Sequence, residues 1–180
     1  MKKGLLTMAG VLLTVSLVSA GTTVPVLAEE ETTLVYGSGD YTRINPAMDE
    51  HGEINILIFN GLTAHDGDNQ VVPGLAESWD FDDETNTYTF HMAEDAKWQD
   101  GEPVTAEDVK FSIERHLEVG GSLPIEADVK SVEAVDEKTV EITLGTAYTP
   151  FLSELANFSN GIIPKDFGGK TEEEFFKNPV

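Results

Sequence analysis

The sequence predicts a mixed fold of α/β or α+β type for the part that follows an N-terminal leader. Three observations predict it: two segments alternate apolar with polar residues, an apolar stripe with helical spacing lies between them, and no internal repeat occurs. Predicted helices and strands therefore interleave along the chain, as they do where helices pack on a sheet. At 180 residues the chain is long enough to bury a core.

The alternating segments predict two strands that each bury one face. Residues 88–92 alternate Tyr, Phe and Met with polar residues, and residues 139–144 alternate Val, Ile and Leu with polar residues. Residues 131–135 are expected to pair with the second of these strands across a turn at 136–138.

The first half of the chain predicts smaller elements. A short strand is expected at 32–36, a turn at Asn45-Pro46, and a helix within 50–60, where apolar residues have helical spacing. Residues 62–65 and 70–72 flank Asp-Gly-Asp-Asn, so they predict a hairpin.

A longer helix is predicted to begin after Thr105. Thr105 followed by Asp108 resembles a capping box, and Val109, Ile113 and Leu117 are expected to form its buried stripe. The helix should end at the glycine pair that follows. Two shorter helices are expected at 151–156 and from Thr171.

The charge of the chain excludes several classes of partner. Lys and Arg number 11 against 33 Asp and Glu, which gives a net charge of −22 and disfavours nucleic acid and acidic lipid. This acidity is consistent with solubility at a cell surface or with cation capture. The absence of cysteine excludes disulfides, thiolate catalysis and Cys-based zinc sites.

Residues 1–28 have the order of a secretory signal peptide. Two lysines precede an apolar run at 5–20, and Val26-Leu27-Ala28 stands before three glutamates. We expect export and cleavage after Ala28, with Val18-Ser19-Ala20 as a second possible site. A membrane anchor is the alternative, although the apolar run is short and contains Gly, Thr and Ser.

Several motifs together resemble the family 5 extracellular solute-binding proteins, which are the oligopeptide, dipeptide and nickel receptors of ABC importers. The motifs are residues 73–79 (PGLAESW), the strand at 88–90, and residues 98–109 (WQDGEPVTAEDV). Residues 59–62 and 147–152 extend the resemblance, which covers residues 32–180.

The resemblance implies that residues 29–180 form part of the first lobe of a two-lobed, type II periplasmic-binding-protein fold. Relatives are about three times longer, so we expect a truncated sequence and no tight solute binding by the 29–180 segment alone. It also implies a receptor that passes peptide, or a nickel complex, to a membrane permease. Such a receptor needs no cofactor and is a monomer when complete. The leader has no lipid-accepting cysteine, so the expected location is the periplasm or the extracellular surface.

The resemblance also singles out residues with expected roles. A structural role is expected for Trp79, Trp98, Asp100, Gly101, Thr105 and Asp108. Asp100 and Glu102 could form a catalytic carboxylate pair, but turn chemistry explains them better. Ligand-facing residues are expected around Asn45-Pro46, namely Tyr41, Arg43, Met48, Asp49, His51 and Glu53.

Two further interpretations of polar residues remain open. Asp49, His51 and Glu53 could suit a transition metal, although alternating polar residues are common in exposed loops. The histidines at 65, 91 and 116 are expected to be ordinary surface or strand residues. A secreted hydrolase is the competing class, but the sequence has none of the usual nucleophile, zinc-protease or phosphate-binding motifs. An adhesive surface domain would predict repeats, which are absent.

Overall fold

The computed structural model describes residues 35, 37, 44–48, 53–121 and 123–179. Contacts divide the chain into residues 1–38 and 39–180, and all of the described helices and strands belong to the second unit. In chain order these elements are α1 (Glu53–Ile58), β1 (Thr63–His65), β2 (Val71–Pro73), β3 (Ala76–Asp82), β4 (Thr87–Met92), α2 (Ala106–Val119), β5 (Val129–Ala134), β6 (Thr139–Leu144), α3 (Phe151–Leu155), the 3-10 helices η1 (Phe158–Asn160) and η2 (Lys165–Gly169), and α4 (Glu172–Lys177). The strand predicted at 32–36 lies almost wholly outside the described residues.

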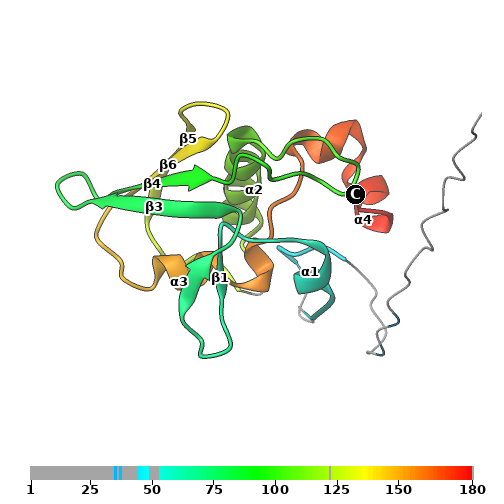
Figure 1. Ribbon diagram of the computed structural model, residues 1–180, viewed down its shortest axis with the longest axis horizontal. Coiled ribbons are helices and arrows are strands. Elements are labelled where there is room, and N and C mark those ends of the chain that lie inside the picture. Colours follow the sequence, from blue (N-terminus) through cyan, green and yellow to red (C-terminus); the bar gives the residue numbers. More distant parts are fainter. Residues whose placement is uncertain (1–34, 36, 38–43, 49–52, 122, 180) are drawn as a thin grey trace, which may run out of the picture. The chain divides into compact units, whose positions relative to one another are not determined.

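A four-stranded antiparallel sheet in the order β3-β4-β6-β5 supports one face of α2 (Figure 1). The register places Tyr88 opposite Ile142 and Phe90 opposite Val140, so apolar side chains pair across the two central strands. These four side chains are buried, whereas the intervening residues of β4 and β6 are more exposed. The predicted alternation in both strands is therefore confirmed.

Helix α2 begins where the sequence predicts. Thr105 accepts a hydrogen bond from the Asp108 amide, the Asp108 carboxylate accepts one from the Thr105 amide, and Gly120 ends the helix with a φ of 66°. Val109 and Ile113 are buried as expected, but the prediction for Leu117 is wrong, because this side chain is 38% exposed. The stripe continues through His116, which lies about 20° from Val109 around the helix axis, whereas Leu117 lies about 80° away.

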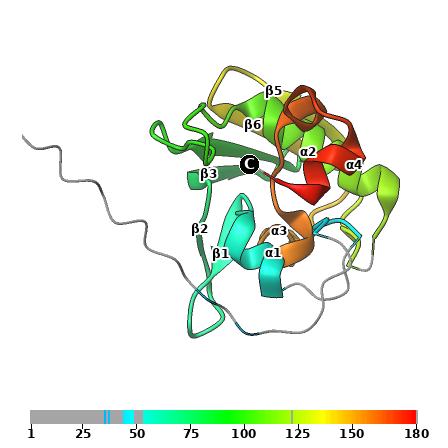
Figure 2. The same cartoon turned by 90° about the vertical axis from the view of Figure 1, so that its right-hand side faces the viewer.

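Two apolar clusters form the interior. The larger one joins the sheet, α2 and α3, and includes Phe90, Val109 and Phe151. The smaller one has Phe59, Ile163 and Phe175 at its centre, with partly buried phenylalanines of α2, η2 and α4 packed against it. The smaller cluster joins residues at the end of α1 to α4, the last helix. Figure 2 shows the ribbons of these two helices.

The smaller predicted elements are present, and one strand was missed. The structure contains the β1–β2 hairpin, a helix within residues 50–60, and an α4 helix capped by Thr171. Strand β3 was not predicted, because a bulge between Ala76 and Ser78 breaks the alternation at its start. Val135, predicted in a strand, lies beyond β5 and is 55% exposed.

Candidate ligand-binding surface

The structure describes part of the loop that the sequence assigns to ligand binding. Met48 lies in a turn and is 43% exposed, and Glu53 is the first residue of α1. The other four candidates, Tyr41, Arg43, Asp49 and His51, lie outside the described residues. The assignment of these six residues to ligand contacts therefore stays a prediction.

The turn before this loop is anchored on the C-terminal end of α2. The Met48 amide donates to the Asn45 carbonyl at 3.0 Å, and the Arg115 guanidinium donates to the Asn45 side-chain oxygen at 3.5 Å. A β-carbon at residue 121 would overlap the carbonyl oxygen of Ala47, so only glycine fits beside the turn. Residues 45–48 are therefore fixed beside the end of α2.

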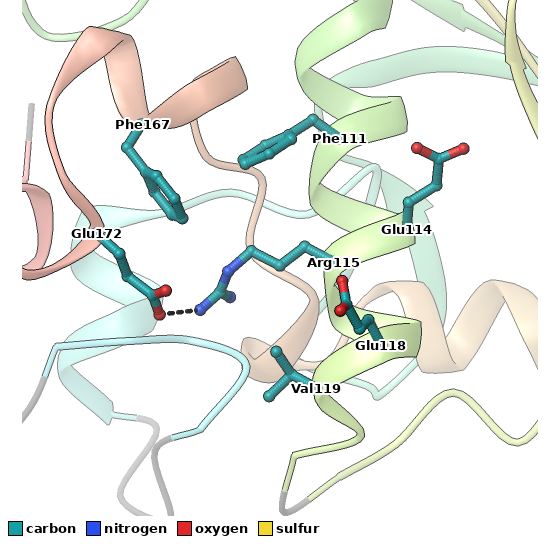
Figure 3. A pocket seen from close by; sticks show the side chains of 7 residues that line it. All are labelled: Phe111, Glu114, Arg115, Glu118, Val119, Phe167 and Glu172. Carbon is teal, nitrogen blue, oxygen red and sulfur yellow. Dashed lines mark hydrogen bonds and ion pairs between the residues drawn. The ribbon is translucent and has the colours of Figure 1, made fainter.

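A hollow of about 570 Å³ lies beside this anchor, and we call it the α2 hollow (Figure 3). Its lining consists of Phe111, Glu114, Arg115, Glu118, Val119, Phe167 and Glu172. The side chains of Phe111 and Phe167 meet edge to face, with ring centroids 5.4 Å apart and an interplanar angle of 85°. The hollow therefore has an aromatic wall with charged groups below it.

Arg115 is held firmly in this hollow. Its side chain is 10% exposed, and its guanidinium donates to the Glu172 carboxylate at 2.6 Å. The guanidinium carbon lies 5.6 Å from the ring centroid of Phe167 and 5.3 Å from that of Phe176. The charge of Arg115 is therefore balanced by Glu172.

The remaining charge of the hollow is negative. Glu114 lies 3.9 Å from Lys110, a half-exposed contact that is worth little. Among the residues that the structure describes, no basic side chain pairs with Glu118. The hollow consequently favours cations over anions.

A second hollow of about 200 Å³ lies between α1, β1 and the α3–η1 segment, and we call it the α1 hollow. Ile56, which is 63% exposed, and Phe158 contribute apolar surface to it. His65 lies on its wall, and its Nε2 is 2.8 Å from the hydroxyl of Ser153. This contact joins residues 88 positions apart, and no local sequence signal could have predicted it.

The Ser153–His65 contact lacks a feature that a catalytic serine–histidine pair needs. Within the described residues, no carboxylate hydrogen-bonds to the imidazole of His65. A catalytic serine needs its histidine oriented by a third group. The pair therefore serves to hold the β1–β2 hairpin against α3, together with the Thr63 hydroxyl, which donates to the Leu152 carbonyl at 2.7 Å.

The structure corrects the prediction that His116 is an ordinary surface or strand residue. His116 lies on α2, is 2% exposed, and has its Nε2 3.1 Å from the carbonyl oxygen of Leu123. Burial lowers the pKa of His116 below its ordinary value, because desolvation disfavours the charged imidazolium. The ring thus belongs to the packing between α2 and the segment that follows it.

The residues of the sequence signature lie in turns, caps and core edges. Asp100 accepts a hydrogen bond from the Glu102 amide at 3.0 Å, and Gly101 has a φ of 93°. Trp79 and Trp98 are partly buried and pack against the larger apolar cluster. Trp98 also lines an open hollow of about 470 Å³ beside the start of α2.

Asp108 connects two elements through both carboxylate oxygens. One oxygen accepts from the amide and the hydroxyl of Thr105, at 2.8 and 2.9 Å. The other accepts from the Lys165 amide at 2.7 Å, so the same side chain caps α2 and holds η2.

The clear pKa shifts among exposed carboxylates have ordinary causes. The pKa of Asp82 is lowered chiefly by its hydrogen bond from the Glu84 amide, and that of Asp136 by its bond from the Lys138 amide. The pKa of Glu174 is lowered first by the Thr171 hydroxyl, within the α4 capping box. Such shifts stabilise turns and caps and give no sign of an acid–base pair.

No three metal-ligating side chains cluster within the part of the chain that the structure describes. The possible set at Asp49, His51 and Glu53 falls largely outside that part. The described surface therefore offers apolar, aromatic and anionic contacts rather than a metal centre.

The comparisons with known proteins decide the family. The profile of the bacterial extracellular solute-binding proteins, family 5, Middle, matches residues 70–180. The chain belongs to this family. The match includes the signature segments at 73–79, 88–90 and 98–109, so the family resemblance seen in the sequence is confirmed.

Individual relatives agree with this membership. The periplasmic oligopeptide-binding protein OppA of Escherichia coli is 31% identical, and the alignment covers 88% of this chain and 33% of that protein. A probable D,D-dipeptide-binding periplasmic protein of the same species is 44% identical over 99 residues, 54% of this chain and 19% of that protein. The crystal structure of NikZ from Campylobacter jejuni with Ni(L-His) has a TM-score of 0.64 and 35% identity, and the alignment covers 78% of this chain and 29% of NikZ.

These comparisons also confirm the fold class. The chain is a mixed α/β structure whose structural neighbours are type II periplasmic binding proteins, and it corresponds to only a part of them. It spans about one third of the length of the curated relative OppA.

Proposed function

We propose that this protein is the solute-binding component of an ABC import system, which captures peptides, or a nickel complex, and delivers them to a membrane permease. Membership of a family of solute-binding proteins is the observation that carries the proposal. Because these residues correspond to about one third of OppA, we expect them to supply only some of the solute contacts of a whole receptor.

Peptide is the favoured solute. The α2 and α1 hollows present aromatic, apolar and anionic groups, which suit peptide side chains. Nickel is the second candidate, and it is favoured by the 35% identity to NikZ, whose structure contains Ni(L-His). Its direct coordination by this chain would depend on Asp49, His51 and Glu53.

We propose binding without chemical turnover. The perturbed exposed carboxylates lie in turns and caps, and the Ser153–His65 contact lacks an orienting carboxylate among the described residues. Incubation of the purified chain with tri- to pentapeptides, followed by mass spectrometry, tests this point. Peptides should be recovered intact, and cleavage that exceeds that of a heat-denatured sample would support the hydrolase alternative.

We further propose export, with the signal peptide at residues 1–28 and the solute-binding segment at 29–180. The leader composition supports this proposal, and the similar protein OppA of Escherichia coli is a periplasmic protein. Within the described residues, no helix has the length and apolar character required to cross a membrane. N-terminal sequencing of the secreted protein should give Glu29 as the first residue, and a cell-retained chain that still starts at Met1 would refute export.

The predicted loop has its own test. Replacement of Asp49, His51 and Glu53 by alanine should weaken solute binding, with thermal stability changed by no more than about 0.5 kcal/mol, as for other exposed polar substitutions. Unchanged affinity in the triple variant would show that the loop makes no solute contact.

A further inference from the structure

We propose that the α2 hollow binds the basic side chain, lysine or arginine, of a peptide solute. That the ligand is a peptide rests on the proposed function. That its side chain is positively charged rests on the geometry and the charge of the hollow. It narrows the solute class from peptides in general to peptides that carry a basic residue.

The size and lining of the hollow fit such a side chain. Its volume of about 570 Å³ lies within the roughly 300–1,000 Å³ of ligand pockets. Phe111 and Val119 offer apolar surface to the methylene stem, while Glu118 offers a carboxylate to the charged end. Figure 3 shows Glu114 directed away from the guanidinium of Arg115, and Glu114 also lies 3.9 Å from Lys110, so Glu118 is the carboxylate that we assign to the bound cation.

The hollow already contains an example of this mode of binding. Arg115 keeps its own guanidinium between aromatic rings and the Glu172 carboxylate, with its side chain 10% exposed. Phe111 and Glu118, one turn before and one turn after Arg115 on α2, line the same hollow and supply one aromatic ring and one carboxylate. These are the two kinds of partner that a second cation needs.

Charge selects a cation over the alternatives. Glu172 balances Arg115 at 2.6 Å, which leaves Glu114 and Glu118 to set the sign of the local potential. The net charge of −22 strengthens that potential at low ionic strength. A neutral side chain of the same shape gains the apolar contacts alone, and an anionic one is repelled.

The decisive experiment is an NMR titration of the full 180-residue chain with Nα-acetyl-arginine amide, and separately with its neutral isostere Nα-acetyl-citrulline amide. The arginine probe should shift the amide signals of Phe111 and Phe167 saturably, with a Kd in the millimolar range, and citrulline should bind at least about fivefold more weakly. Glu118→Gln should weaken arginine binding about two- to fivefold. The matched control Glu84→Gln removes the same charge from the exposed β3–β4 turn and should leave the Kd within experimental error.

Each other outcome overturns the proposal. Equal affinity for the arginine and citrulline probes would mean that the hollow does not recognise the positive charge. An equal loss of affinity in Glu118→Gln and Glu84→Gln would mean that only the net charge of the chain matters. Shifts confined to other residues would place the cation elsewhere. Failure of the proposed function can be told apart from failure of the cation site by a titration with an arginine-containing tripeptide. If the tripeptide shifts no signal while Nα-acetyl-arginine amide still binds, peptide capture is refuted and the cation site is retained.

Discussion

Replacement of Asp108 by alanine should destabilise the fold strongly, although Asp108 does not line either of the two proposed solute hollows. Asp108 is 7% exposed and uses both carboxylate oxygens. One oxygen caps α2 through Thr105, at 2.8 and 2.9 Å, and the other accepts from the Lys165 amide at 2.7 Å. Alanine removes all three hydrogen bonds at once.

The expected magnitude follows from these partners. Thr105 stays as the N-cap, but the carboxylate half of the capping box is lost, which costs about 1 kcal/mol, the net value of a typical hydrogen bond. The Lys165 amide then lacks its acceptor in a partly buried position, and an unsatisfied buried donor costs about 1–3 kcal/mol. The free energy of unfolding should therefore fall by about 2–4 kcal/mol.

Urea unfolding followed by tryptophan fluorescence measures this change, since Trp79 and Trp98 pack against the larger apolar cluster. The control is Glu107→Ala, which breaks only the exposed ion pair with Lys165 and should cost less than about 1 kcal/mol. If Asp108→Ala unfolds at the same urea concentration as the unchanged chain, the structural role assigned to Asp108 is refuted.

Three further predictions concern other parts of the fold. Burial lowers the pKa of His116 in the folded state, so neutral His116 should contribute its full stability above about pH 6.5, the ordinary pKa of histidine. The free energy of unfolding should fall as the pH drops below that value toward the lowered pKa of the folded state. Urea midpoints between about pH 7 and 5 test this, and a slope unchanged by His116→Leu would contradict it. Gly121→Ala should displace the turn at Ala47 and shift its amide signals, whereas Gly67→Ala, where a β-carbon meets open space, should not. Thr171→Ala should lower the free energy of unfolding by about 1 kcal/mol through loss of the α4 cap, and no change in the urea midpoint would show that this helix end is unimportant for stability.

Local signals made much of the fold predictable from the sequence. Alternation at 88–92 and 139–144 depends only on neighbouring residues, and so does the capping box at Thr105 and Asp108. Where a local irregularity interrupts the pattern, as the bulge at the start of β3 does, the prediction failed. The prediction for Leu117 failed for a different reason. Successive steps of four residues rotate gradually around the helix axis, so Leu117 leaves the buried face on which Val109 and His116 lie.

The candidate site was less predictable, because its contacts are non-local. Arg115 meets Glu172 across 57 positions and Asn45 across 70, and no periodic pattern encodes either contact. The α2 hollow exists only once α2, η2 and α4 have packed around the smaller apolar cluster. The sequence therefore indicated the family, and the two hollows could be located only in the structure.

Calorimetric titration of the purified chain with mixed tri- to pentapeptides and with nickel–histidine tests solute capture most directly. We predict saturable binding of at least one peptide class with a Kd weaker than about 10 μM, because a chain that corresponds to one third of OppA makes only part of the contacts of a whole receptor. Peptides with a basic residue should bind more tightly than their citrulline counterparts. The absence of any heat change at millimolar peptide and nickel–histidine, in a chain shown by circular dichroism to be folded, would contradict the account.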